Sequence, residues 1–211
     1  AVRALRRKAF ATTAALLGLL GLTAGLRAND LTTGLLAHYP FDGNAEDISG
    51  NGKHLTLHGN PVIIPSSSGG GIRFDGQDDY ASRNKLLTNT PFTWAFWIKN
   101  HGGGVVMCQG QSQQSSPSVS LGTNLSFQLY TYASHPAHHF ALTHNNHDQS
   151  AWNHFATCRD SGGFKLLYHN GVFLGKSPSS SSFGQNQPKF YIGGNIGYNG
   201  HSSMDLKNIR V

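Results

Sequence analysis

Short runs of alternating hydrophobic and polar residues fill the sequence after about residue 35, and clusters of Gly, Asn, Asp, Ser and Pro separate them. This pattern is typical of antiparallel β-strands joined by turns. The predicted strands are Leu35–Tyr39, Leu55–His58, Gly71–Phe74, Tyr80–Ser82, Phe92–Lys99, Val105–Cys108, Ser118–Leu121, Leu125–Tyr132, His139–Thr143, His154–Arg159, Phe164–His169, Val172–Leu174, Lys189–Ile192 and Leu206–Val211. The sequence therefore predicts one all-β domain over residues 29–211.

Two turns are specified by their residues. Asn170-Gly171 lies between two alternating runs, and this pair is preferred in two-residue type I′ turns, where both positions need a positive φ. It predicts a β-hairpin. Asp75-Gly76, between Phe74 and Tyr80, predicts a second and longer connection of the same kind.

The run Phe92–Lys99 carries an aromatic side chain on each of its two faces, with Trp94 on one and Trp97 on the other. A strand of this kind is usually central and covered on both sides, so both tryptophans are predicted to lie in the core. Trp152, which opens another predicted strand, is interpreted in the same way.

The first 28 residues differ from the rest of the chain. They combine a basic start, an apolar run over Ala14–Ala24 and small residues before a plausible cleavage point after Ala28, which is typical of a secretory signal peptide. The run is shorter than the roughly 20 residues of a membrane-spanning helix. The alternative is a retained N-terminal apolar helix, either as an anchor or packed within an assembly.

Charge excludes one class of partner. Five of the 16 Lys and Arg residues precede Asn29 and all 10 Asp and Glu residues follow it, so the domain itself is nearly neutral despite the formal charge of +6. A domain without a basic surplus lacks the electrostatic footprint of nucleic-acid binding. Contact with a membrane is expected only through an uncleaved leader, and self-association stays open.

The chain has two cysteines, Cys108 and Cys158, and both lie in predicted strands. If export exposes the protein to an oxidising compartment and the two strands are neighbours, the cysteines can form a disulfide. Sequence does not show whether the strands are adjacent, so two free thiols are the equal alternative.

Several segments, taken in order, are similar to one known family. They are LLAHYPFDGNAEDISGNG, GIRFDGQDDYAS, FTWAFWIKN, WNHFATCRD, FKLLYHNGVFLG, KFYIGGN and LKNIRV. Together they resemble the laminin G-like, or concanavalin A-like, lectin and glucanase domains from about Leu35 to Val211. The resemblance implies a jelly-roll sandwich of two antiparallel sheets, found in secreted and surface proteins and usually serving as a non-catalytic recognition module.

The number of glutamates argues against a glycosidase. Members of this superfold that hydrolyse glycans by retention use two carboxyl groups about 5 Å apart, supplied by two Glu on one strand. This chain has a single Glu, Glu46, so we expect no catalysis. A hydrolase that uses Asp42 or Asp79 is kept as a third hypothesis.

The resemblance also implies a structural calcium ion where the first loop meets the last strand. The side chains that would bind it are Asp42, Asn44, Asp47, Asn51 and Asp205. Lys207 stands where relatives often carry an acidic residue, so it can instead replace the cation with a salt bridge to the first loop. The alternative is a metal-free network of Asx turns in this loop.

A ligand site on this fold is expected on loops at one edge or on the concave sheet. Sugar recognition combines an aromatic surface with amide and imidazole hydrogen bonds. Two segments supply such groups, and the candidate residues are Tyr132, His135, Asn195, Tyr198, Asn199 and His201. The alternative is that these polar loops only solubilise the rim.

These observations favour a recognition module that is secreted, periplasmic or on the cell surface, with a glycan or an extracellular protein as its partner. The alternative function is a structural subunit of an extracellular assembly or filament that keeps its N-terminal apolar segment. Intact mass of the exported protein distinguishes the two, because only the module is expected to lose about 28 residues.

Overall fold

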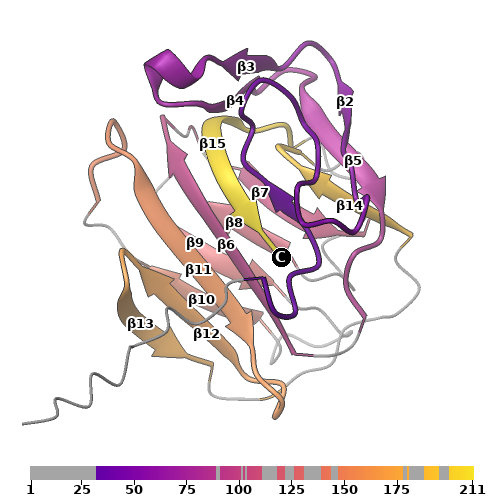
Figure 1. Cartoon of the computed structure of the whole chain (residues 1–211). Helices are drawn as coiled ribbons and strands as arrows, with labels where there is room; N and C mark the ends of the chain where they lie inside the picture. Colours follow the sequence, from indigo (N-terminus) through magenta and orange to yellow (C-terminus); the bar gives the residue numbers. More distant parts are fainter. Residues whose placement is uncertain are drawn as a thin grey trace, which may run out of the picture. The chain divides into compact units, whose positions relative to one another are not determined.

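Two antiparallel β-sheets pack face to face in the computed structural model (Figure 1). The structure describes residues 32–88, 91–100, 102, 104–110, 118–121, 126–130, 139–143, 147–177, 180, 188–194 and 200–211, with the backbone alone between 118 and 143. The predicted signal peptide or N-terminal helix lies outside these ranges. No helix in the described ranges is long and apolar enough to cross a membrane.

The larger sheet, which we call sheet A, has eight strands. Its spatial order is Val172–Lys176 (β13), Lys165–His169 (β12), Asn153–Arg159 (β11), Phe92–Lys99 (β6), Ser203–Arg210 (β15), Gly71–Asp75 (β4) and Val62–Ile64 (β3), and His38–Tyr39 (β1) also pairs with β15. The strand latest in sequence therefore lies near the middle of this sheet.

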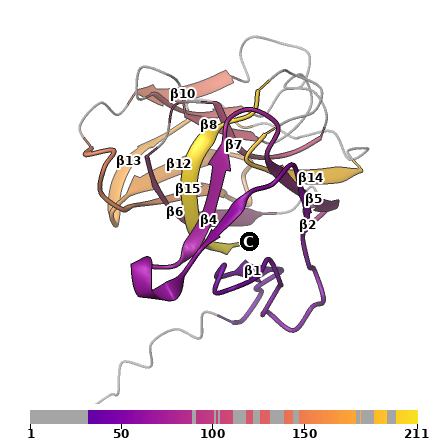
Figure 2. The same ribbon diagram turned by 90° about the horizontal axis from the view of Figure 1, so that it is seen from above.

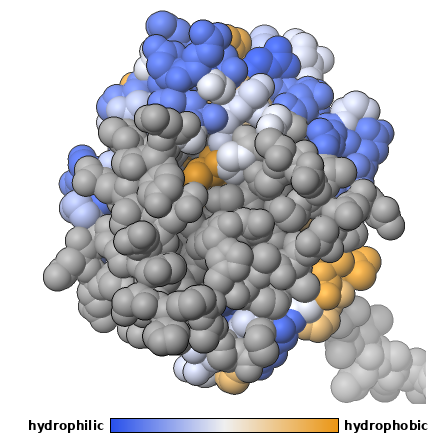
Figure 3. All heavy atoms as spheres, turned by 180° about the vertical axis from the view of Figure 1, so that it is seen from behind, coloured by the Kyte–Doolittle hydropathy of each residue, from blue (hydrophilic) through white to orange (hydrophobic). Residues whose placement is uncertain are grey.

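The second sheet, sheet B, has seven strands. Its order is His139–Thr143 (β10), Ser126–Tyr130 (β9), Ser118–Leu121 (β8), Gly104–Gln109 (β7), Lys189–Ile192 (β14), Tyr80–Asn84 (β5) and Thr56–His58 (β2). In the view from above, β8 and β10 lie beyond β15 and β4 of sheet A (Figure 2). From behind, the described side chains along the upper rim are mainly hydrophilic (Figure 3). The two-sheet sandwich predicted from the sequence is confirmed.

Large side chains from the facing surfaces of the two sheets form the core. Trp94, Phe96 and Ile98 alternate along β6 and are fully buried, with Phe74 from sheet A and Phe190 from sheet B. Burying each such side chain contributes about 1.5–3 kcal/mol. The alternation along β6 thus fixes which of its faces points inward.

The two predicted turns have different outcomes. Asn170-Gly171 joins β12 and β13 as a hairpin, with φ of 48° and 80° at its two residues, so that prediction is confirmed. Asp75-Gly76 does not form a hairpin. It begins a connection from β4 in sheet A to β5 in sheet B, because both strands pair with other partners.

Two of the three tryptophans lie outside the core, contrary to prediction. Trp94 is fully buried, whereas Trp97 and Trp152 are only partly buried on the outer face of sheet A, the surface turned away from sheet B. The expectation that the strand is covered on both faces was therefore wrong.

Of the two alternatives for the cysteines, the structure has two free thiols rather than a disulfide. Cys108 lies in β7 of sheet B and Cys158 in β11 of sheet A, and both are free thiols. Cys158 accepts a hydrogen bond from the Thr93 hydroxyl at 3.3 Å, and burial raises the pKa of its thiol. The strands that carry the two cysteines are not neighbours, so the condition for a bridge fails.

Candidate functional site

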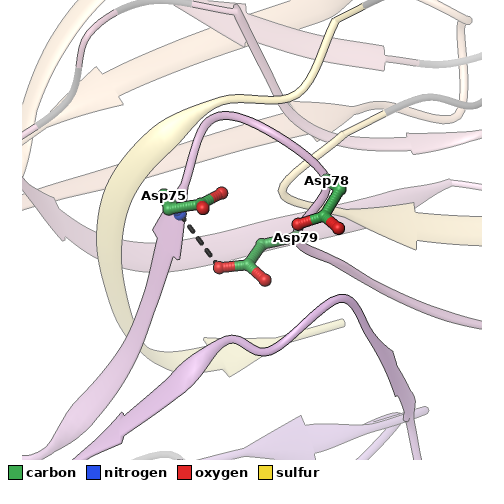
Figure 4. Close-up of side chains that lie close together, drawn as sticks. All are labelled: Asp75, Asp78 and Asp79. Atoms are coloured by element: carbon green, nitrogen blue, oxygen red, sulfur yellow. Dashed lines mark hydrogen bonds between the residues drawn. The ribbon is translucent and has the colours of Figure 1, made fainter.

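The connection from β4 to β5 brings three carboxylates together at the corner between the two sheets. Asp75, Asp78 and Asp79 each offer an oxygen, and these atoms lie within 4.8 Å of one another (Figure 4). Asp75 and Asp78 are exposed, whereas Asp79 is 3% exposed. Carboxylate oxygens in this arrangement suit a hard cation such as Ca²⁺.

Asp79 has a structural role at this corner. One of its oxygens accepts the N–H of Asn60 at 2.6 Å and the other accepts the N–H of Asp75 at 3.1 Å. A Cβ on Gly59 would come within 2.5 Å of the Asp79 carboxylate, so glycine is needed at that position. The carboxylate therefore ties the connection to the segment that follows β2.

Aromatic and imidazole rings gather next to the aspartates. Tyr80 stacks on His58 across paired strands, with ring centroids 4.2 Å apart and planes 6° apart. His201 lies 5.9 Å from Tyr80, and its Nδ1 is 3.4 Å from the main-chain oxygen of Asp79. We call the three aspartates and these three rings the corner site.

Of the predicted ligand-binding residues, the structure describes only His201. Tyr132, His135, Asn195, Tyr198 and Asn199 lie outside the described residues.

Gly194 and Gly200, which flank residues 195–199, both lie beside His201. A Cβ on Gly194 would lie 3.0 Å from His201 Nδ1 and 3.5 Å from the Gly200 oxygen, so these two glycines are close to His201. Sequence reasoning missed Tyr80 and His58. Their shared face depends on the pairing of β2 with β5, and no local pattern specifies that pairing.

The first loop, where a calcium ion was predicted, is organised around Asp47. One carboxylate oxygen accepts the N–H groups of His38 and Ser49, each at 2.9 Å. The other accepts the Ser49 hydroxyl at 2.9 Å and the Lys53 N–H at 2.8 Å. Burial favours a raised pKa for Asp47, but these hydrogen bonds outweigh it and hold the pKa below its ordinary value.

The other predicted ligands in this loop also have partners within the protein. Asn51 donates its amide to the main-chain oxygens of Leu35 and Leu36, at 2.8 and 3.3 Å. Asn44 accepts the N–H of Glu46 at 3.0 Å in an Asx turn.

Asp42 accepts a hydrogen bond from the Ser66 hydroxyl. Together with the contacts of Asp47, Asn44 and Asn51, this bond forms a hydrogen-bond network around the first loop, as the Asx-turn alternative expects.

Asp205 is not part of the first loop. It lies in β15 and forms two hydrogen bonds with the Arg73 guanidinium, at 2.6 and 2.9 Å, and one with the Asn100 amide at 2.9 Å. Burial favours a raised pKa, but Arg73, Asn100 and Lys99 hold the pKa of Asp205 below its ordinary value.

The predicted ligand residues all have hydrogen-bond partners within the protein. Asp205 and Asp47 share no hydrogen-bond partner among the described contacts. Lys207 contacts the Gly69 oxygen at 3.0 Å rather than an acidic residue of the loop. Calcium binding there stays a prediction.

A hollow of about 470 Å³ lies at the beginning of β6. Its lining includes Thr93, Cys158 and Asp160. Because burial raises the pKa of the Cys158 thiol, the group stays protonated near neutral pH and is a poor nucleophile. We assign no chemistry to this hollow.

Similar structures share the sandwich. Domain 4 of AbnA, an extracellular GH43 arabinanase from Geobacillus stearothermophilus solved with arabinotriose, has a TM-score of 0.66 and 17% identity, covering 83% of this chain and 90% of that one. The receptor-binding domain of a botulinum neurotoxin C/D mosaic has a TM-score of 0.65 and 13% identity over 85% of this chain.

The neurotoxin match covers 48% of the toxin domain, so this chain spans about half of its length. The binding domain of botulinum neurotoxin DC, solved with rat synaptotagmin II, gives a TM-score of 0.61 and 13% identity, over 85% of this chain and 48% of that one. Identities this low establish the fold alone.

The sequence itself matches a family model. No curated protein matches the sequence. A laminin G model described as "Concanavalin A-like lectin/glucanases superfamily" matches residues 74–211, which include the aspartates of the corner site and His201. The chain belongs to the concanavalin A-like lectin/glucanases superfamily.

Proposed function

We propose that this domain is a non-catalytic module that binds carbohydrate at the corner site. The observation that carries the proposal is the stack of Tyr80 on His58, with His201 at its edge and three carboxylates beside it. An aromatic surface next to imidazole and carboxylate groups matches the two faces of a sugar, its apolar C–H surface and its ring of hydroxyls.

The similar structures support a binding role. The AbnA domain was solved with arabinotriose, and one botulinum neurotoxin binding domain was solved with SialylT, at a TM-score of 0.62 to this chain. Another was solved with rat synaptotagmin II, so an extracellular protein is the alternative partner. AbnA is an extracellular enzyme, which agrees with a secreted, periplasmic or surface location for this domain.

The carboxylates of the corner site are poorly suited to glycoside hydrolysis. Asp79 is 3% exposed and both of its oxygens accept main-chain N–H groups, so it is not accessible as a nucleophile. Asp75 and Asp78 are exposed, whereas a general acid needs a shielded site that keeps its carboxyl protonated. Glu46, the single glutamate, is exposed in the first loop.

Calorimetric titration with neutral oligosaccharides, arabinotriose among them, tests the proposal. We expect Tyr80→Ala and His201→Ala to weaken binding about tenfold each, a loss of roughly 1.4 kcal/mol. Tyr168→Ala, on the outer face of sheet A, is the matched control and should bind like the wild type. Equal weakening in Tyr168→Ala, or no binding across the panel, contradicts the proposal.

A further inference from the structure

Trp152 and two lysines form a cluster on the outer face of sheet A, the face turned toward the viewer in Figure 1. The Nζ atoms of Lys207 and Lys99 lie 4.2 and 5.0 Å from the centre of a Trp152 ring. An indole ring attracts ammonium groups, and this attraction lets two like charges stay close together.

Glycine makes room for this arrangement. Gly71 has a φ of +124°, and a Cβ there would come within 2.6 Å of the Leu206 oxygen and 3.4 Å of Trp152 Cη2. A Cβ on Gly69 would lie 3.7 Å from Trp152 Nε1. The indole therefore extends over the beginning of β4. Next to it, the main-chain oxygen of Gly69 accepts the hydrogen bond of the Lys207 ammonium.

The cluster carries more positive than negative charge. Asp205 lies directly opposite Lys99 and Arg73 in the strand register and is 1% exposed. It binds Arg73 closely and is 3.9 Å from Lys99. Arg73 and Lys99 thus share one buried carboxylate, and Lys207 adds a third cation to the cluster.

Lys207 is the cation whose positive charge is least balanced by acidic groups. Among the residues that the structure describes, it forms no ion pair, and its one hydrogen bond goes to the neutral Gly69 oxygen. Burial and the charge of Lys99 both lower the pKa of Lys207. A bound anion would relieve this repulsion.

An aromatic side chain lies next to these charges. Lys207 is opposite Trp97 in the register, and Trp97 is opposite His154, with a centroid distance of 5.2 Å between their rings. Trp97 is partly exposed on the same outer face. A sugar ring stacked on Trp97 would place a substituent near Lys207.

We propose that this surface, formed by Arg73, Lys99, Trp152, Lys207 and Trp97, is a second binding site whose ligand is an anionic polysaccharide with carboxylate or sulfate groups. Charge complementarity selects the anion, and the partly exposed indole of Trp97 selects a sugar over a bare ion. The surplus of cations is small and local, unlike the long basic tracks that bind nucleic acids. The site lies on sheet A, whereas the Tyr80–His58 stack lies on sheet B.

Binding to dextran sulfate, with neutral dextran as the matched ligand, tests the proposal, and polygalacturonate tests carboxylate in place of sulfate. We expect the intact chain to bind the charged polymers and not dextran, and the affinity to fall as salt rises. The double variant Lys99→Gln/Lys207→Gln should weaken binding about tenfold, since two exposed ionic contacts are lost.

The control is Lys176→Gln/Lys189→Gln, which removes the same charge from two exposed lysines elsewhere. This control should bind like the wild type. Trp152→Phe, which keeps an aromatic ring, should also bind like the wild type. Trp152→Leu should lose as much affinity as the double variant Lys99→Gln/Lys207→Gln. Circular dichroism and the melting temperature establish that each variant is folded.

Three outcomes overturn the proposal: equal loss in the control pair, equal binding to dextran and dextran sulfate, or preference for RNA or anionic vesicles over both acidic polysaccharides. The two sites are tested separately. His201→Ala should leave dextran sulfate binding unchanged, and the double lysine variant should leave neutral oligosaccharide binding unchanged.

Discussion

The first loop and the middle of sheet A each bury an aspartate, and they stabilise its charge by different means. Asp47 accepts hydrogen bonds from main-chain N–H groups and one hydroxyl, and all of these come from within a short stretch of chain. Asp205 accepts charged and amide donors from β4 and from the end of β6, which lie far away in sequence.

This difference determines how much stability is lost when each carboxylate is removed. The donors around Asp47 are neutral and fixed by the main chain, so they are left unpaired if the carboxylate is lost. The cations around Asp205 are long side chains, and Arg73 is 55% exposed, so water can hydrate them. A buried carboxylate is thus costlier to remove when its donors are held in place by the main chain than when they are long, exposed side chains.

The largest effect is expected at the first loop. Asp47→Ala leaves three main-chain N–H groups without an acceptor, and we expect a loss of about 3 kcal/mol in the free energy of unfolding. Urea denaturation measures it, and Asp47→Asn, which keeps one oxygen, should lose roughly half as much. A loss in Asp47→Ala no greater than in a surface control such as Asp78→Ala would show that the network is unimportant.

A smaller effect is expected in sheet A. Asp205→Ala removes the partner of Arg73 and Asn100, and we expect a loss of about 2 kcal/mol, because the cations gain hydration that the donors around Asp47 cannot. The same denaturation series checks this order. If Asp205→Ala costs more than Asp47→Ala, then the cations are less free to reach water than their exposure indicates.

Acid should weaken both regions in the same direction. The pKa values of Asp47 and Asp205 are below the ordinary value of about 3.9, so each carboxylate contributes stability that is present above that pH and is lost as pH falls through its lower folded pKa. Unfolding free energies measured from pH 6 downward should fall below about pH 4, and less steeply in Asp47→Asn and Asp205→Asn. A pH dependence unchanged in both variants would contradict the assignment.

The smallest effect is expected from metal removal at the first loop. Since both oxygens of Asp47 already accept hydrogen bonds, a chelator should leave the melting temperature unchanged. Calcium that stabilises the wild type but not Asp47→Asn would restore the predicted metal site in the first loop. Stabilisation that disappears instead in Asp78→Asn would place the ion at the corner site.

The sequence predicted the strands well, because the alternation of side chains reports directly on burial. Phe92–Lys99 and Lys189–Ile192 have the predicted bounds, although β3, Val62–Ile64, was missed beside Pro61 and Pro65. Alternation does not say which partner a strand takes. For that reason Asp75-Gly76 was mistaken for a hairpin, and the two partly buried tryptophans, Trp97 and Trp152, were assigned to the core.

Candidate sites were harder to predict than the fold. The type of a residue shows that Asp47 and Asp205 are potential ligands, but their existing donors come from the folded chain, and Arg73 is 132 positions away from Asp205. His201 was singled out because its local composition is unusual, and its role in binding stays a prediction. Tyr80 and His58 were missed because each looks like an ordinary strand residue until the pairing of β2 with β5 brings them together.

The position of β15 also bears on how the domain assembles during synthesis. This strand joins β1, β4 and β6, yet all three precede it by a hundred positions or more, as the separations of 170, 132 and 105 residues in its side-chain contacts show. Before β15 leaves the ribosome, β4 and β6 lack the strand that lies between them. Sheet A therefore closes only after β15 has been synthesised, with the slow kinetics typical of non-local pairing, and until then the facing edges of β4 and β6 stay unpaired.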